Sequence, residues 1–251
     1  MDHSGDVSDE MLFLDGLAVN YDMVDESSQA RLMRDLLMRV VTPYVNGGVA
    51  LELGCEAGYM TARIASVVDR LDVVDGSEQF LEEARQRNIP GTSYYHSLFE
   101  EFEPETEYDY VFASHVLEHV IDVRAVLAMV RKALKPEGYL FAFVPNARAM
   151  SRQLARRMGL VESLYHLTPN DLKGGHRRVY DMALLVRDLE SSGFRLLAQG
   201  GVLLKPFADF QMEKLLDTGI LGPLQCEGLF RLGCEYPDMC ADVYAIGVPG
   251  E

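Results

Sequence analysis

The fold of this chain is decided by the stretch Leu51-Glu52-Leu53-Gly54-Cys55-Glu56-Ala57-Gly58. The apolar run 49–53 predicts a short buried strand, and the residues from 58 to about 68 predict a helix. Gly54 allows a tight turn between them, and a turn with few side chains lets a ligand approach the backbone. The helix also offers free N–H groups in its first turn. The stretch therefore indicates a nucleotide-like cofactor at this turn without deciding which one.

Strands and helices alternate on both sides of this turn. Apolar spacing predicts helices over 30–44, 77–87, 122–134 and 181–192, and short apolar runs predict strands at 71–74, 92–96, 108–113, 139–144, 194–199 and 242–248. Strands of about five residues that alternate with helices imply right-handed crossovers and a parallel sheet. The last two strands are expected to pair as an antiparallel edge. The pattern predicts an α/β, doubly wound fold.

Two insertions and the N-terminus depart from the alternation. Residues 146–180 are basic and irregular, and residues 205–240 have helical character near 208–217 with turn residues around 222–223. Residues 1–15 are acidic and weakly periodic, which predicts a frayed end. We therefore expect an N-terminal helical cap segment, 1–45, and a main domain, 46–251. Both insertions are expected to form a lid near the carboxyl ends of the strands.

The charge balance limits the kind of partner. The chain carries 23 basic and 39 acidic residues, a formal net charge of −16. This balance disfavours a nucleic-acid partner, because such binding gains affinity from Lys and Arg that neutralise phosphates. The sequence shows no run of 18 apolar residues, no secretory signal and no CxxC pair among its four cysteines. We expect a cytoplasmic protein with a small-molecule partner, no nucleic-acid or membrane partner, and a homodimer as an open alternative.

Asp75 narrows the choice of cofactor. It ends the predicted second strand, 21 residues after Gly54. A carboxylate at this place can accept hydrogen bonds from both hydroxyls of a ribose. The turn and Asp75 together favour a cofactor that contains a nucleoside.

The order of the motifs leads to a family. The stretch 51–58 resembles the first motif of class I S-adenosylmethionine-dependent methyltransferases of the small-molecule type, and Val74-Asp75-Gly76-Ser77 resembles the second. The stretches 108–111, 115–120 and 134–140 resemble three later motifs. The resemblance covers residues 17–146 well and the rest loosely. It implies S-adenosylmethionine as cofactor and a Rossmann-like sheet of seven strands, ordered 3-2-1-4-5-7-6 with strand 7 antiparallel.

Glu56 departs from the family pattern, which usually has a third glycine at this place. Its side chain would crowd the amino-acid end of the cofactor unless it points outward. We expect this change to lower cofactor affinity without loss of function. A non-catalytic binding protein with the same fold is the alternative that Glu56 leaves open.

The resemblance also implies which residues hold the cofactor. Glu52 and Gly54 would flank its methionine part, and Asp75 would hold its ribose. His115 would approach the methionine part through its backbone, and Tyr21 looks like the N-terminal tyrosine that closes over the cofactor in many small-molecule members. The full set by position is Tyr21, Glu52, Gly54, Gly58, Asp75, Gly76, Ser77, Ser97, Leu98 and His115, of which Gly76, Ser77, Ser97 and Leu98 would line the adenine.

Three histidines are candidates for the catalytic base. Methyl transfer needs the acceptor aligned behind the methyl carbon, and a hydroxyl acceptor must also lose a proton. Imidazole, with a pKa near ~6.5, is the natural base at neutral pH. His119 lies in the loop that faces substrate in the family, whereas His166 and His176 lie between the fifth strand and the next helix. Each could instead be a hydrogen-bonded structural histidine.

These residues favour methyl transfer to an oxygen of a small molecule, in natural-product or sugar biosynthesis. The near alternative is N-methylation of a small amine or amino sugar. A nicotinamide-dependent oxidoreductase and a metal-dependent RNA methyltransferase are less favoured. In the latter, Glu118, His119 and a later histidine would be metal ligands, but the motif has a glutamate where this chain has His115. No metal is expected.

Overall fold

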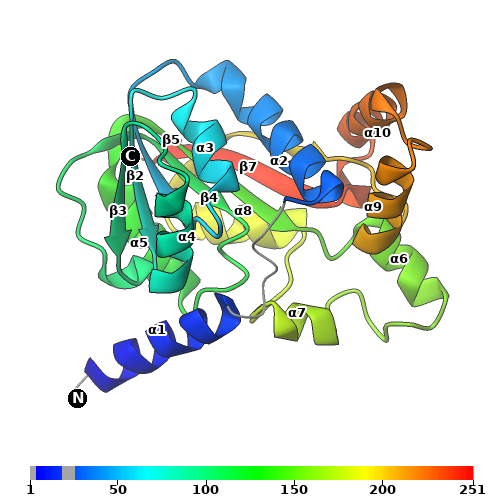
Figure 1. Ribbon diagram of the computed structural model, residues 1–251, viewed down its shortest axis with the longest axis horizontal. Helices are drawn as coiled ribbons and strands as arrows, with labels where there is room; N and C mark the ends of the chain where they lie inside the picture. The colour runs from blue at the N-terminus through cyan, green and yellow to red at the C-terminus, as the bar shows by residue number, and fades with distance from the viewer. Residues whose placement is uncertain (1–3, 19–25, 251) are drawn as a thin grey trace.

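A computed structural model describes residues 4–18 and 26–250. Within these ranges one seven-stranded sheet has the order β3-β2-β1-β4-β5-β7-β6 (Figure 1). β1 to β5 pair in parallel, and β7 runs antiparallel to both of its neighbours. The predicted order and the direction of strand 7 are confirmed. The strands are β1 (Val49–Leu53), β2 (Arg70–Asp75), β3 (Thr92–His96), β4 (Tyr108–Ser114), β5 (Leu134–Pro145), β6 (Phe194–Val202) and β7 (Asp242–Pro249).

Helices cover both faces of the sheet and enclose two apolar cores (Figure 1). Phe112 and Phe141 lie side by side on β4 and β5, with ring centroids 5.0 Å apart and no exposed surface. Burying such a side chain contributes roughly 1.5–3 kcal/mol. One face carries α2 (Ser28–Val41), α3 (Tyr59–Ala65), α4 (Glu78–Gln86) and α10 (Pro223–Glu235), and the other carries α5 (Val123–Ala133) and α8 (Met182–Ser191).

The helix starts follow local capping chemistry. Ser77 accepts a hydrogen bond from the Phe80 N–H, and Asp122 accepts from two N–H groups at the start of α5. Each such cap contributes roughly 0.5–2 kcal/mol. The predicted helix over 58–68 is shorter than expected, because the N–H groups of Ser66 and Val67 bond three residues back and end α3 in a turn.

The expectation of a frayed N-terminus is wrong. Residues Ser4–Ala18 form helix α1, which lies across the carboxyl ends of the strands (Figure 1). Its Asp15 accepts a hydrogen bond from the Ser77 hydroxyl at 2.7 Å, and its Glu10 pairs with Arg177 at 2.6 Å. The apolar periodicity is weak because the helix is held by contacts at scattered positions. Tertiary contacts therefore stabilise a segment whose local signal is poor.

The insertions contain more helix than the sequence predicted. Residues 146–180, expected to be irregular, include α6 (Met150–Arg157) and α7 (Pro169–Lys173). The helix expected near 208–217 is confirmed as α9 (Asp209–Asp217), but the turn expected at 222–223 begins α10, because proline is well placed in the first turn of a helix.

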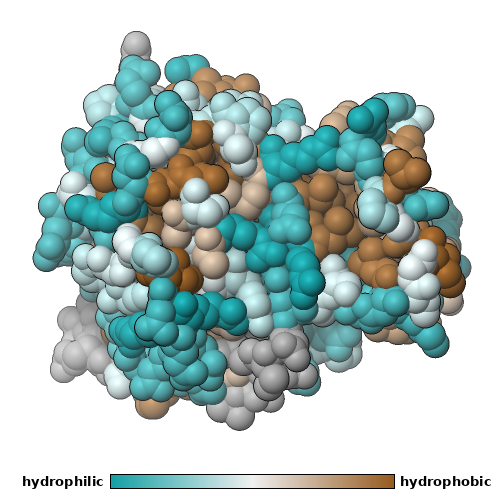
Figure 2. All heavy atoms as spheres, turned by 45° about the horizontal axis from the view of Figure 1, so that its top comes forward, coloured by the Kyte–Doolittle hydropathy of each residue, from teal (hydrophilic) through white to brown (hydrophobic). Residues whose placement is uncertain are grey.

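The second insertion packs against the edge of the sheet. α10 packs against β6, and its Glu227 pairs with Arg39 on α2. Figure 2 shows the lobe that α6, α9 and α10 form beside the main body, with hydrophobic side chains at its surface. The exposed members of α9 and α10 include Phe210 and Leu224.

β5 and β6 extend furthest beyond their predicted ranges, and short 3-10 turns link several elements. β5 begins at Leu134, where the sequence predicted a helix stop, and a register shift opposite Tyr108 and Tyr110 accommodates the extra residues. β6 continues to Val202. The 3-10 turns are η1 (Thr42–Tyr44), η2 (Phe99–Glu101) and η3 (Pro237–Met239). No helix in the described ranges is long and apolar enough to cross a bilayer.

Candidate active site

The turn at residues 54–58, called here the first turn, joins β1 to α3 at the carboxyl edge of the sheet. Gly54 and Gly58 have φ values of 74° and 78°, a region that favours glycine. A Cβ on Gly58 would lie 3.0 Å from the Ala84 Cα, so a side chain would push α3 away from α4. The two glycines are therefore required by backbone geometry and close packing, as the sequence indicated.

Asp75 is oriented by the first turn. Its Oδ2 accepts a hydrogen bond from the Cys55 N–H, and its Oδ1 accepts one from the Ser77 N–H, both at 2.9 Å. Burial raises the pKa of this carboxyl, and the two backbone donors oppose that rise. Oδ2 also accepts from the Cys55 thiol, whereas Oδ1 keeps a lone pair for a further donor. The carboxylate is thus held ready at the end of β2, in the position expected for ribose binding.

A cavity of about 200 Å³ lies next to Asp75, between α1 and the loops that follow β2, β3 and β4. Gly76 and Leu98 form part of its wall, and Leu14 of α1 covers them. A Cβ on Gly76 would lie 2.5 Å from a Leu14 methyl carbon. Ser97 donates its N–H to the Asp75 carbonyl at 3.1 Å. The predicted adenine-lining residues therefore lie together, under a helix that the sequence did not predict.

Glu52 is the penultimate residue of β1, and its carboxyl is buried. It is 2% exposed, and neither carboxyl oxygen has a hydrogen-bond partner among the described residues. Burial raises the pKa of Glu52 to about 8. A buried polar group of this kind carries a desolvation penalty until a donor reaches it. Glu52 therefore offers an unused acceptor beside the first turn.

The side chain of Glu56 points away from the sheet. Its Oε2 lies 2.6 Å from Nη2 of Arg34 on α2, and its backbone has a left-handed φ of 46°. The outward direction was one of the two outcomes considered from the sequence. Arg34 was missed there, because only its position on α2 brings it to the turn.

Glu118, His119 and His176 form a compact group, called here the histidine cluster. The two imidazole rings meet edge to face with centroids 4.7 Å apart, and His119 Nε2 lies 3.9 Å from a Glu118 oxygen. Burial lowers the pKa of His119 to about 3 and also lowers the pKa of His176. Both imidazoles are therefore neutral at neutral pH.

Two arginines bring the loops of the histidine cluster together. Arg177 donates to the His119 carbonyl at 2.7 Å, and Arg178 donates to the carbonyls of Leu117 and Val120. These bonds tie the loop before α8 to the loop after β4. The position of the histidine cluster thus depends on arginine bonds to backbone carbonyls, and these bonds could not be predicted from the sequence.

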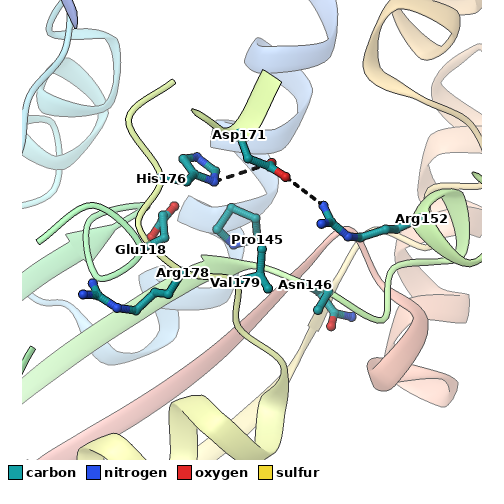
Figure 3. A pocket seen from close by; sticks show the side chains of 9 residues that line it. Glu118, Pro145, Asn146, Arg152, Asp171, His176, Arg178 and Val179 are labelled. Atoms are coloured by element: carbon teal, nitrogen blue, oxygen red, sulfur yellow. Dashed lines mark hydrogen bonds and ion pairs between the residues drawn. The ribbon is translucent and has the colours of Figure 1, made fainter. Parts of the chain in front are cut away.

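Glu118 and His176 face one another across a cavity of about 20 Å³ (Figure 3). Glu118 is 1% exposed and has no hydrogen-bond partner in the described ranges, and burial raises its pKa to about 7. On the other side, His176 Nδ1 lies 3.6 Å from Asp171, which lies 3.3 Å from Arg152. Asp171 therefore places a negative charge beside Nδ1 of His176 without a hydrogen bond to it, and the second ring nitrogen stays available for other partners.

The histidine cluster could also hold a metal ion. One ligand atom from each of its three residues lies within 4.8 Å of the others. Neutral imidazole and carboxylate are ligands that divalent transition ions accept. The unpartnered Glu118 carboxyl supports the fit, because a cation would supply its missing partner.

His115 turns its ring toward β7. Its Nε2 lies 2.8 Å from an Asp242 oxygen, and its φ is 56°. Burial disfavours the charged ring, but Asp242 outweighs this effect and raises the pKa of His115 to about 9. His115 is thus a cation at neutral pH, at the end of β4 beside the histidine cluster.

Among the described residues, His166 does not join these groups. Its side chain is exposed, its N–H donates to the Ser163 carbonyl, and its carbonyl accepts from Arg152. Tyr21 lies outside the described residues. Asp171, Arg152 and Asp242 were not predicted. Asp242 meets His115 only through the pairing of distant strands, whereas Asp171 caps α7 next to Thr168 and lies five residues before His176.

A comparison with known families decides the assignment. A family model described as a methyltransferase domain matches residues 26–199, more than half of the chain. The chain belongs to this methyltransferase family. The class I, S-adenosylmethionine-dependent type expected from the motifs is confirmed, together with its sheet order.

Individual relatives of this methyltransferase agree with that assignment. The chain is 28% identical over 171 residues, 66% of each protein, to a ubiquinone biosynthesis O-methyltransferase of Hydrogenovibrio crunogenus. It is 28% identical over 195 residues, 71% of this chain and 51% of the relative, to the mitochondrial enzyme of that name of Bos taurus. The chain therefore spans between half and two thirds of the length of these relatives.

Solved structures support the fold. The N-methyltransferase NodS of Bradyrhizobium japonicum WM9, in complex with S-adenosylhomocysteine, superimposes with a TM-score of 0.59 over 91% of both chains. The sequence identity is 18%. At this identity the likeness concerns the architecture alone.

Proposed function

We propose that this methyltransferase transfers the methyl group of S-adenosylmethionine to an oxygen of a small-molecule acceptor. The observation that carries the proposal is the His176 imidazole beside Glu118, with the Asp171 carboxylate 3.6 Å from Nδ1, because a nearby carboxylate favours an imidazole that accepts a proton. The names of the relatives, which are O-methyltransferases, support oxygen as the acceptor atom. Natural-product or sugar biosynthesis remains the proposed setting.

The cofactor position follows from the first turn and its neighbours. Asp75 would accept the ribose hydroxyls, Glu52 would accept donors from the methionine part, and Gly76 and Leu98 would line the adenine. When bound, the cofactor supplies a methyl group on a sulfonium, which is a good leaving group. The protein then has to position the acceptor oxygen and remove its proton.

His176 is the best-placed base. It is neutral, because burial lowers its pKa, and the Asp171 carboxylate opposes this effect and favours the imidazolium once a proton arrives. As the acceptor oxygen forms its bond to the methyl carbon, the carbon–sulfur bond breaks and the hydroxyl proton passes to His176. His119, whose pKa of about 3 makes it a poor base, is proposed to contact the acceptor.

A second candidate is the same transfer assisted by a divalent cation. The histidine cluster favours it, since Glu118, His119 and His176 would be the ligands. A bound cation would lower the pKa of an acceptor hydroxyl. In that case the three side chains would act as ligands, and none of them would be the base.

A chelator experiment separates the two candidates. The purified protein, dialysed against EDTA, is assayed with S-adenosylmethionine on a panel of phenols, sugars and amines. Full activity on hydroxyl acceptors after dialysis supports His176 as base, and loss that Mg²⁺ or Zn²⁺ restores supports the cation. Turnover of amines alone would contradict the proposed oxygen acceptor.

A further inference from the structure

Glu56 occupies a position where a glutamate needs an explanation. Its φ of 46° is a conformation that L-residues adopt at roughly 1–2 kcal/mol relative to glycine. Its carboxylate is paired with Arg34 at 2.6 Å, and its side chain is 42% exposed. The ion pair therefore holds a strained residue in place while leaving it a path to solvent.

Arg34 is fixed more firmly than its partner. Its side chain is 17% exposed, and Nη1 lies 3.0 Å from Glu26, whose side chain is 7% exposed. Its guanidinium carbon also lies 5.4 Å from the centre of the Tyr59 ring. One side of the guanidinium is thus anchored, and Nη2 is the edge presented to the first turn.

The Arg34 charge reaches the amino-acid end of the cofactor site. Arg34 borders this end through its 2.6 Å contact with Glu56 in the first turn. Its charge slightly lowers the pKa of Glu52, which burial raises, and the pKa of His115, which Asp242 raises against burial. These two residues stand where the methionine part of the cofactor is expected. A guanidinium binds carboxylates through planar, charge-assisted hydrogen bonds, and S-adenosylmethionine carries one carboxylate at this end.

We propose that Glu56 is an internal competitor of the cofactor carboxylate, and that Arg34 exchanges the Glu56 carboxylate for that of the cofactor on binding. The inference rests on the proposed cofactor position. Two carboxylates cannot share the Nη2 edge of Arg34 without repelling one another. Glu56 therefore turns to solvent when the cofactor enters and returns when the product leaves.

The competition lowers affinity for both cofactor and product. Breaking the Arg34–Glu56 pair offsets part of the new ion pair with the cofactor, so the net gain is smaller than it would be with glycine at position 56. Because the Glu56 side chain is already partly exposed, turning it to solvent costs little free energy. Weaker product binding follows, because S-adenosylhomocysteine carries the same carboxylate.

Calorimetric titration tests this inference with two ligands. S-adenosylhomocysteine has the carboxylate, whereas 5′-methylthioadenosine keeps the adenosine and the sulfur but lacks the amino-acid part. For Glu56→Gln we expect binding of S-adenosylhomocysteine to tighten by roughly threefold to tenfold, and binding of 5′-methylthioadenosine to stay the same. Glu227→Gln is the matched control, since Glu227 also pairs with an α2 arginine, Arg39, but lies far from the first turn.

Arg34 variants complete the test. Arg34→Lys and Arg34→Met should weaken S-adenosylhomocysteine by about tenfold or more and spare 5′-methylthioadenosine. In either background the Glu56→Gln effect should vanish, because the competition needs the guanidinium. Unchanged or weaker S-adenosylhomocysteine binding in Glu56→Gln would overturn the inference, and would assign Glu56 the role of holding Arg34 in place. A wild-type protein that binds neither ligand would instead contradict the proposed cofactor position.

Discussion

The first turn and the histidine cluster both lie at the carboxyl ends of the strands, but they are assembled in different ways. The first turn and the end of β1 beside it are one continuous stretch, residues 52–58, and backbone geometry sets the positions of their groups. The histidine cluster joins Glu118 and His119 to His176, and arginine bonds to backbone carbonyls hold the two loops together. A local site can be recognised from spacing, whereas a site made by two loops depends on how those loops pack.

If the first turn binds the cofactor and the histidine cluster carries out the proton transfer, the largest effect on kcat is expected at His176. His176→Ala should lower kcat by roughly 10²–10⁴-fold, because a positioned base contributes that much. S-adenosylhomocysteine affinity, measured by calorimetry, should be unchanged. His166→Ala is the matched control in the same insertion, and its kcat should equal that of the wild type. Loss of cofactor binding in His176→Ala would show that the two regions are not independent.

At Asp75, by contrast, a substitution should weaken cofactor binding. Asp75→Ala should weaken S-adenosylhomocysteine by roughly 100-fold, since about two hydrogen bonds to a charged group are lost. Binding is measured by calorimetry, and Asp217→Asn on α9 serves as control because Asp217 bonds only an exposed serine among the described residues. An affinity within twofold of the wild type would remove Asp75 from the ribose site.

The raised pKa of Glu52, beside the first turn, predicts that the free energy of unfolding depends on pH. Its pKa is raised from 4.5 to about 8 in the folded protein, so the native state keeps a proton that the unfolded chain releases. The wild type should therefore lose stability as pH rises from about 4.5 through 8, by a few kcal/mol as an order of magnitude. Glu52→Gln should lack this loss.

Urea unfolding of both proteins at pH 5 and pH 8.5 measures the Glu52 effect. Relative to the wild type, the variant should be more stable at pH 8.5 than it is at pH 5. An equal difference at both pH values would contradict a raised pKa at Glu52.

The smallest expected effect is at Asp242, beside the histidine cluster. The pKa of His115 is raised to about 9, so its pairing with Asp242 stabilises the fold below about pH 6.5 and is lost as pH rises through 9. Asp242→Asn should lower Tm by roughly 2–4 °C at pH 6, and by less at pH 9.5. The His115 side chain is 39% exposed, so solvent screening keeps the effect modest. A Tm difference between wild type and Asp242→Asn that grows with pH would contradict the pairing of charged His115 with Asp242.

Much of the fold could be predicted because its signals are local. The predicted strands at 49–53 and 92–96 match β1 and β3 residue for residue, and Ser77 and Asp122 start helices where expected. α1 was missed because its residues show weak periodicity and its contacts are made with Ser77 and Arg177. α10 was missed because Pro223 was interpreted as a turn, although proline also begins helices.

The candidate site divides in the same way. Gly54, Gly58 and Asp75 could be found from spacing, since the turn requires glycine and the strand end presents a carboxylate. Arg34 could not, because no local rule states which residue of a distant helix will face a turn. Asp171 was missed although it lies five residues before His176, in the helix-capping pattern of Thr168 and Asp171.

By itself the sequence determined the alternation of strands and helices and the groups of the first turn, because hydrophobic period and turn chemistry act over a few residues. The sheet order came from the resemblance of its motifs to a known family. Only the tertiary structure decided that Glu56 turns toward Arg34, that His176 joins Glu118 and His119, and that His166 stays outside. The physical reason is that ion pairs and buried polar contacts depend on distances of a few ångströms between segments far apart along the chain.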